Sequence, residues 1–151
     1  EEGLDTGGVH DRWETAIGPD DTVDELRERL ARAGADLLVT NLTKGLGPAE
    51  PQVGETTYAE KLDPAELQVD WTRPAVEIHR LVRVGGAWTS HVGTPLSLWA
   101  TARDERPDSV PVAAGDGPLY LVEVQPEGRR RMPAAAWANG VRWRSGDRLG
   151  T

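Results

Sequence analysis

The fold of this chain is decided by the stretch Val110-Pro111-Val112-Ala113-Ala114-Gly115-Asp116-Gly117-Pro118-Leu119-Tyr120-Leu121. A Gly-Asp-Gly sequence between two apolar runs is a strong β-hairpin signal, because tight hairpin turns need residues that adopt positive φ angles. On one side Val110, Val112 and Ala114 alternate with other residues, and on the other Leu119 and Leu121 share one face. The stretch therefore predicts two antiparallel strands with a common buried face.

The same period of two extends upstream, beginning after Gly85-Gly86. There Leu96, Leu98 and Ala100 alternate with Ser97, Trp99 and Thr101, and Trp88–Val92 shows a similar alternation. Four or five short antiparallel strands flanked by helices suggest a small barrel of the oligonucleotide-binding (OB) type. A small β-sandwich is the alternative, and either gives an α+β fold class.

A long amphipathic helix is predicted to start at Thr22, which forms a capping box with Glu25. Its apolar side chains fall on one stripe at spacings of three and four: Val23, Leu26, Leu30, Ala33 and Leu37. A strand is expected before it over residues 8–17. Residues 1–43 have no other sizeable apolar surface, so we expect this helix to pack on protein outside the chain.

Further helices are predicted around the strands. Pro64 should begin one, and Thr72 should cap another whose buried stripe is Ala75, Ile78, Leu81 and Val82. A short Ala-rich helix should run from Pro133 to Asn139 and end at Gly140. The Gly- and Pro-containing residues 44–57 read as a linker.

Composition narrows the function classes. Cysteine is absent from the 151 residues, which excludes disulfides and thiolate metal sites. No apolar run reaches membrane-spanning length, so no membrane association is expected. His10, His79 and His91 lie far apart without ligand spacing, and we expect no metal site. No phosphate-binding loop or nucleophile elbow is recognisable.

The net charge of −8 is unevenly distributed. Residues 1–61 hold 14 acidic and 6 basic residues, whereas residues 62–151 hold 11 of each. The acidic balance of the whole chain argues against a nucleic-acid binder. Locally, however, arginines gather near the C-terminus: Arg129, Arg130, Arg131, Arg142, Arg144 and Arg148.

Six segments, in their order along the chain, resemble the C-terminal half of the methionyl-tRNA formyltransferase family. They are Gly3-Leu4-Asp5-Thr6-Gly7, Asp20-Asp21-Thr22, Thr57-Tyr58-Ala59-Glu60-Lys61-Leu62, Asp70-Trp71, Gly86-Ala87-Trp88-Thr89 and Val124-Gln125-Pro126-Glu127-Gly128-Arg129-Arg130-Arg131-Met132. The resemblance covers nearly the whole chain, and the last segment is its most specific part.

The resemblance implies three parts. Residues 1–43 would be the end of a Rossmann-like formyltransferase domain, residues 44–61 a linker, and residues 62–151 an OB-like tRNA-binding domain. The missing N-terminal catalytic domain would pack on residues 1–43. Such an enzyme would be cytoplasmic and would act in translation initiation.

The resemblance also implies the chemistry. The family transfers a formyl group from 10-formyltetrahydrofolate to the amino group of initiator methionyl-tRNA, using an Asn, a His and an Asp. Asp5 matches that Asp, and Gly3 and Leu4 match the loop beside the folate. A plain turn, with Gly3 and Gly7 at positive φ, is the alternative for this loop. The family's Asn-X-His stretch is absent here, so we expect the chain by itself to be inactive.

The tRNA contacts implied are Arg129, Arg130 and Arg131, with Lys61, Arg80 and Arg83 as weaker candidates. Guanidinium groups suit phosphate oxygens because they form bidentate hydrogen bonds. A solvated charge run is the alternative for the arginine cluster. For the whole chain, the alternatives are the C-terminal part of a sugar-nucleotide formyltransferase and a free-standing RNA-binding module.

Overall fold

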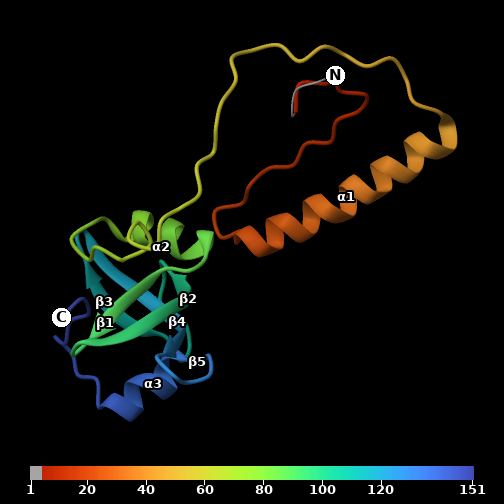
Figure 1. Ribbon diagram of the computed structural model, residues 1–151. Coiled ribbons are helices and arrows are strands. Elements are labelled where there is room, and N and C mark those ends of the chain that lie inside the picture. Colours follow the sequence, from red (N-terminus) through yellow and green to blue (C-terminus); the bar gives the residue numbers. More distant parts are fainter. Residues whose placement is uncertain (1–4) are drawn as a thin grey trace. The chain divides into compact units, whose positions relative to one another are not determined.

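The computed structural model describes residues 5–151. The chain divides into two compact units, Glu1–Glu60 and Lys61–Thr151, called here the N-terminal and C-terminal units (Figure 1). Among the described residues, no helix is both long and apolar enough to cross a membrane.

The N-terminal unit is dominated by one helix, α1 (Val23–Lys44). The predicted capping box is confirmed: the Glu25 amide donates to Thr22 Oγ1 at 3.3 Å, and the Thr22 amide donates to Glu25 Oε2 at 2.9 Å. These bonds satisfy backbone donors that no helical carbonyl can reach. The Thr22 amide and the Thr22 hydroxyl, which both donate to Glu25 Oε2, lower the pKa of Glu25 below its ordinary value.

The predicted apolar stripe of α1 has no buried member. None of the 22 residues of α1, all of which the structure describes, is buried. Within the stripe, Leu26, Ala33 and Leu37 are half-buried and Leu30 is 46% exposed. The helix thus forms from its local sequence signals, while its apolar stripe lacks the full burial that normally supplies most helix stability.

The prediction of a strand over residues 8–17 is wrong. Only a single bridge forms there, in which Val9 and Glu50 exchange backbone hydrogen bonds of 2.8 and 2.9 Å. A strand needs a neighbouring strand for its backbone groups, and the described part of this unit has none to extend the ladder. Trp13 and Ile17 consequently remain 44% and 69% exposed.

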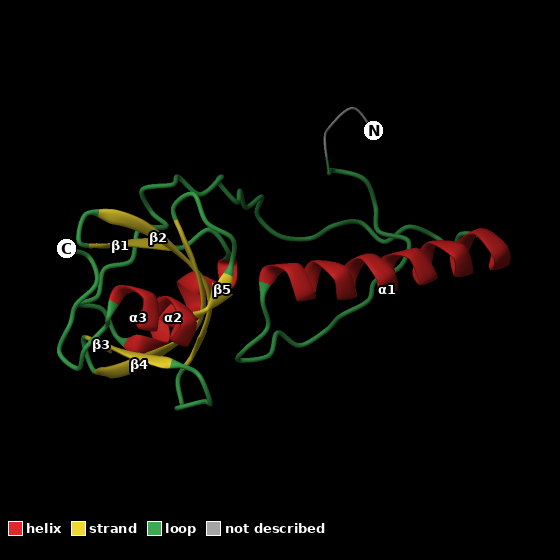
Figure 2. Ribbon diagram, turned by 90° about the horizontal axis from the view of Figure 1, so that it is seen from below, coloured by secondary structure: helices red, strands yellow, loops and turns green. Residues whose placement is uncertain are grey.

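The C-terminal unit is built on one antiparallel sheet. Its strands are β1 (Trp88–His91), β2 (Thr94–Ala102), β3 (Val110–Ala114), β4 (Gly117–Pro126) and β5 (Met132–Pro133). The order is β1-β2-β4-β3, and β5 also pairs with β4. The sheet is curled, and α2 (Ala75–Val84) and α3 (Ala134–Val141) lie at its opposite ends (Figures 1 and 2). The predicted antiparallel strands with flanking helices are confirmed.

Strand β4 organises this sheet. One edge pairs with β2, from Leu96 opposite Pro126 to Ala102 opposite Tyr120. The other edge pairs first with β3 and then with β5. The predicted hairpin turn lies between β3 and β4, and all three apolar residues that β4 turns inward are completely buried: Leu119, Leu121 and Val124.

The hairpin turn also holds the start of α2. The Gly115 amide donates to the Arg73 carbonyl at 2.8 Å, and a Cβ at Gly115 would lie 2.0 Å from the Thr72 oxygen. Asp116 Oδ1 accepts the Ala75 amide at 2.7 Å and so caps the helix. The prediction that Thr72 caps α2 is wrong, because its hydroxyl donates to Asp70 Oδ1 instead.

Two further helix predictions need correction. Pro64 begins only a turn, since the Leu67 carbonyl and the Val69 amide already pair with the backbone of Trp88. Gly140 lies inside α3, which ends at Val141 and is followed by the C-cap Arg142 with a left-handed φ of 56°. The buried core joins both helices to the sheet through Ile78, Val82 and Trp137.

Candidate functional site

An exposed tryptophan lies on an irregularity of β2. The pairing with β4 skips Trp99 on one strand and Val122 on the other, so the register is the same on either side of the irregularity. The alternation of β2 therefore continues through this place. Trp99 is 40% exposed, whereas Leu98 is only 2% exposed. The alternation places a large aromatic ring on the outer face of the sheet.

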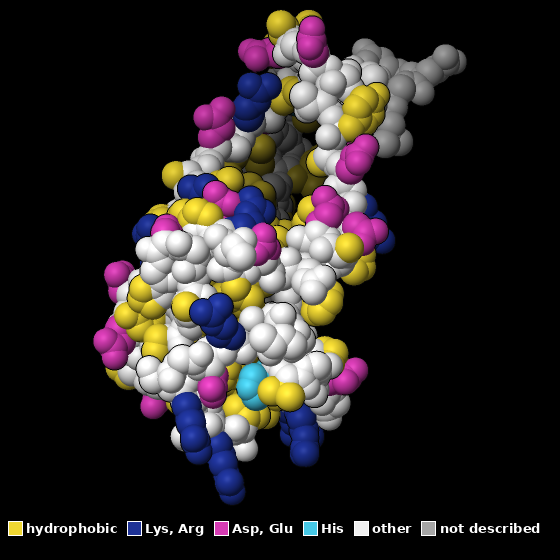
Figure 3. Space-filling view, turned by 90° about the vertical axis from the view of Figure 1, so that its left-hand side faces the viewer, with side chains coloured by type: hydrophobic (Ala, Val, Ile, Leu, Met, Phe, Trp, Pro, Cys, Tyr) yellow, Lys and Arg dark blue, Asp and Glu magenta, His cyan; other side chains and the backbone are white. Residues whose placement is uncertain are grey.

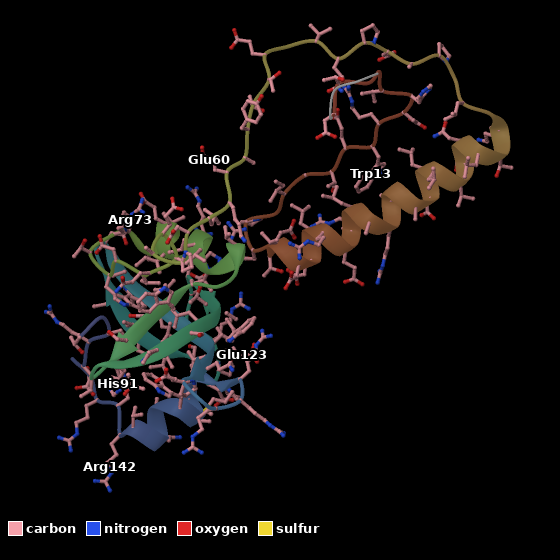
Figure 4. The ribbon with its side chains drawn as sticks, viewed as in Figure 1. Trp13, Glu60, Arg73, His91, Glu123 and Arg142 are labelled. Carbon is pink, nitrogen blue, oxygen red and sulfur yellow. The ribbon has the colours of Figure 1, made fainter. Side chains whose placement is uncertain are left out.

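The Trp99 ring is fixed by two neighbours. Its Nε1 donates to Gln125 Oε1 at 3.0 Å, and the Arg131 guanidinium lies 4.4 Å from the ring centroid. Arg131 also forms a 2.6 Å ion pair with Glu123, which lies on β4 near β5 (Figure 4). The hydrogen bond and the cation–π contact hold the ring in one orientation.

The three consecutive arginines are not equivalent. All of them are exposed, but Arg131 is already paired with Glu123 and stacked on Trp99. The turn before it is fixed, because the Arg129 amide donates to the Pro126 carbonyl at 3.0 Å and the Arg129 carbonyl accepts from Gln125 Nε2 at 2.9 Å. Gln125 thus connects residues 127–131, called here the arginine turn, to Trp99.

The other predicted cationic contacts differ in exposure. Lys61 and Arg80 are exposed, but Arg83 is half-buried. The expectation that Arg80 and Arg83 share one exposed face is therefore wrong for Arg83. Arg83 lies on the last turn of α2, directly after the buried Val82.

A cavity of about 510 Å³ lies beside α3. Its wall includes His91 from β1, Arg129 from the arginine turn, and Trp137 and Gly140 from α3, and no Asp or Glu is among its described lining residues. His91 packs edge-on against Trp137, with ring centroids 5.3 Å apart. Lys and Arg side chains project from this end of the unit in Figure 3, at the bottom of the view.

Asp5, the predicted catalytic residue, is exposed and has a left-handed φ of 58°. Gln52 Nε2 donates to the carbonyls of Asp5 and Gly7, both at 2.8 Å. Gly7 does not have the positive φ that a plain glycine turn predicts, so Asp5 itself takes that conformation. Gly3 and Leu4 lie outside the described residues.

The described histidines have structural partners. His79 is buried and its Nδ1 lies 2.8 Å from Thr101 Oγ1, while His10 Nδ1 lies 2.8 Å from the Gly47 carbonyl oxygen. No group of three His, Cys, Asp or Glu residues that could hold a metal ion occurs within residues 5–151.

Sequence reasoning missed Trp99 as a site residue. The signal was present, since the alternation of β2 places Trp99 with Ser97 and Thr101 on the side opposite Leu98. A large aromatic on a polar face is unusual enough to mark a position as a candidate. The contacts of Trp99 with Gln125 and Arg131 could not be predicted from the spacing.

Comparison with known proteins gives consistent matches. Residues 61–142 match the family model described as the C-terminal domain of formyl transferases. Curated relatives named methionyl-tRNA formyltransferase include proteins from Thermobifida fusca (39% identical, covering 97% of this chain and 54% of that protein) and Paracoccus denitrificans (40%, 93% and 52%). The chain spans about half the length of the curated relatives it matches.

Solved structures similar to the chain include HypX from Aquifex aeolicus. One HypX variant gives a TM-score of 0.72 at 18% identity and covers 98% of this chain and 30% of that one. HypX in complex with tetrahydrofolic acid gives a TM-score of 0.68 at 17% identity, with coverages of 91% and 28%. At such low identity the likeness supports the fold alone.

Proposed function

The chain belongs to the formyl transferase family defined by its C-terminal domain, and on this premise we propose that it is the C-terminal portion of a methionyl-tRNA formyltransferase. The observation that carries the proposal is the 39–40% identity to proteins of that name over 93–97% of the chain. The reaction would move a formyl group from 10-formyltetrahydrofolate to the amino group of initiator methionyl-tRNA. The tetrahydrofolate complex of HypX fits a folate donor.

In this reaction Asp5 would assist the removal of a proton from the methionyl nitrogen. The methionyl nitrogen attacks the formyl carbon, and the tetrahedral intermediate needs hydrogen-bond donors at its oxyanion and loses a proton from nitrogen. Collapse of the intermediate expels the folate nitrogen. A carboxylate at Asp5 would stabilise a cationic imidazole contributed by the Asn-X-His stretch, which this chain lacks. The exposure of Asp5 is compatible with such a role.

Residues 1–43 would pack on the catalytic domain, completing its Rossmann-like end. The exposed apolar side chains of α1 support this, since Leu30, Leu38 and Leu42 would be covered by such a partner. Residues 44–61 would then be the linker to the tRNA-binding domain, and the folate loop would include Gly3 and Leu4.

The C-terminal unit would bind tRNA as an OB-like domain. Support comes from the exposed arginine turn: residues 128–151 contain six arginines and one acidic residue. Arg129, Arg130 and Arg131 would contact phosphates, with Lys61, Arg80 and Arg83 contributing less. As a translation enzyme acting on tRNA, the protein would work in the cytoplasm.

A chimera tests the proposal directly. This chain would replace the corresponding C-terminal half of the Thermobifida fusca protein, with that protein's N-terminal half alone and this chain alone as controls. We expect the chimera to formylate initiator methionyl-tRNA and neither control to do so. A chimera that folds and binds the folate donor but formylates no methionyl-tRNA would contradict the proposed function.

A further inference from the structure

We propose that Trp99 is a stacking platform for an unpaired base of the bound RNA. The inference rests on the proposed function and adds to it a kind of contact different from the phosphate contacts of the arginines. Its basis is the presence at one place of an exposed indole, side chains that fix the indole, and exposed arginines.

An indole is exposed here on a face where small polar side chains are usual. The alternation of β2 buries Leu96 and Leu98, which are 1% and 2% exposed, and places Trp99 on the opposite, outer face. A large aromatic side chain gains most from full burial, so an indole that is 40% exposed on this face is available to a partner.

The ring of Trp99 is held in one orientation by its neighbours in the protein. A flexible exposed tryptophan would lose rotamer freedom on binding, but Trp99 is already held by Gln125 and Arg131. Arg131 covers part of the indole, and Glu123 holds Arg131 in place. The remaining surface of the ring is open, at 40% of the residue. A base can therefore stack on it at little further ordering cost.

The arginines near Trp99 indicate the chemistry of the partner. The Arg129 carbonyl is hydrogen-bonded to the same Gln125 that holds Trp99, so the exposed guanidiniums of Arg129 and Arg130 extend from a turn tied to the ring. An aromatic face beside exposed cations matches the alternating base and phosphate of single-stranded nucleic acid. An apolar peptide would use the ring but not the cations, and a duplex would use the cations but not the ring.

Arg131 differs from Arg129 and Arg130 in the part it would play. Its charge is neutralised by Glu123 and its planar group lies over Trp99, so it acts as a positioning residue for the ring. Phosphate contact then falls mainly to Arg129 and Arg130.

The test measures binding of deacylated initiator tRNA to the purified chain over a range of salt concentrations. Trp99→Ala should weaken binding about 5- to 150-fold, the range for loss of one base–aromatic stack, without changing the salt slope. Trp99→Phe should keep most of the affinity because the ring remains. Tyr58→Ala is the matched control, since Tyr58 is an aromatic residue of the linker segment that is 88% exposed.

A second probe, a blunt RNA duplex without unpaired bases, separates stacking from general damage. Its affinity should be equal for the wild type and Trp99→Ala. Equal loss on both probes, or no loss on tRNA, overturns the stacking proposal while leaving the proposed function intact. Absence of salt-dependent tRNA binding by the wild-type chain would instead count against the proposed function itself.

Discussion

The two principal helices differ in what supports them. Helix α1 has 22 residues and a complete capping box, yet none of its residues, all of them described, is buried. Helix α2 has only 10 residues and no side-chain cap of its own, yet Ile78, His79 and Val82 are buried against the sheet. The helix with the complete capping signal, α1, is therefore the one without buried residues, whereas α2, which has no side-chain cap of its own, is packed against the sheet.

The comparison separates two sources of order. Capping and apolar spacing suffice to place α1 in the sequence, but such signals add only small increments to stability. Helix α2 takes its cap from Asp116, 41 residues away, and its stability from the core. The C-terminal unit should therefore fold alone, whereas the N-terminal unit should depend on a partner.

The largest expected effect comes from Asp5 in the N-terminal unit. In the formylating chimera, Asp5→Asn should slow the chemical step by about 10²–10⁴-fold, the range for general acid–base groups. Affinity for tRNA should hardly change, because the proposed tRNA contacts lie in the other unit. Single-turnover formylation measures the rate, and a near-normal value would reduce Asp5 to a turn residue.

Next in size is the hairpin turn of the C-terminal unit. Gly115→Ala would place a Cβ 2.0 Å from the Thr72 oxygen, and we expect a loss of about 3 kcal/mol from such overpacking. Chemical denaturation followed by tryptophan fluorescence measures it. The control is Gly34→Ala in α1, where nothing lies within 4 Å of the added Cβ and the change should raise helix content. Similar losses for both variants would remove the contrast between the units.

The arginine turn gives a smaller effect, on binding. If Arg129 and Arg130 each contact one phosphate, their joint replacement by Ala should lower the slope of log affinity against log salt by about 1.4–1.8. Arg131→Ala should change the slope less, because Glu123 already neutralises that charge. A slope unchanged in the double variant would return the cluster to the solvated-loop interpretation.

The smallest effects concern the two caps. Asp116→Ala should destabilise the C-terminal unit by about 1 kcal/mol, the typical value of a lost helix cap. Thr22→Ala should lower the helix content of α1 without shifting that unfolding transition. Circular dichroism and denaturation together distinguish the two, and a transition shifted equally by both changes would show that the units unfold as one.

Lowering the pH should also reduce the helix content of α1. Hydrogen bonds from Thr22 lower the pKa of Glu25 in the capping box, so their stabilisation is present above the ordinary pKa. It should be lost as the pH falls through the lowered pKa. Glu25→Gln should lack this component of the acid transition in circular dichroism, whereas Thr22→Ala should only reduce it, because the backbone amide of residue 22 still donates to Glu25.

Much of the C-terminal unit could be predicted from sequence because its signals agree. The Gly115-Asp116-Gly117 turn and the alternation of β2 and β4 all point to one sheet. The strand expected at residues 8–17 failed because alternation cannot reveal whether a pairing strand exists. The bond between Asp116 and Ala75, and the contacts of Gln125 and Arg131 with Trp99, depend on tertiary structure that no local pattern carries.

For the site, the sequence could identify the cationic side chains but not the contacts that each of them makes. Arg129, Arg130 and Arg131 are adjacent and chemically identical, and only their neighbours distinguish them. Whether each contacts phosphate stays a prediction.

The most direct test of the central contrast is limited proteolysis of the intact chain, followed by mass spectrometry of the products over time. We expect the first cuts between Lys44 and Tyr58, a stretch without helix or extended strand, then degradation of α1 while residues 61–151 persist. Equal protection of α1 and the C-terminal unit would contradict the account, because it would mean that α1 is stabilised within the chain itself.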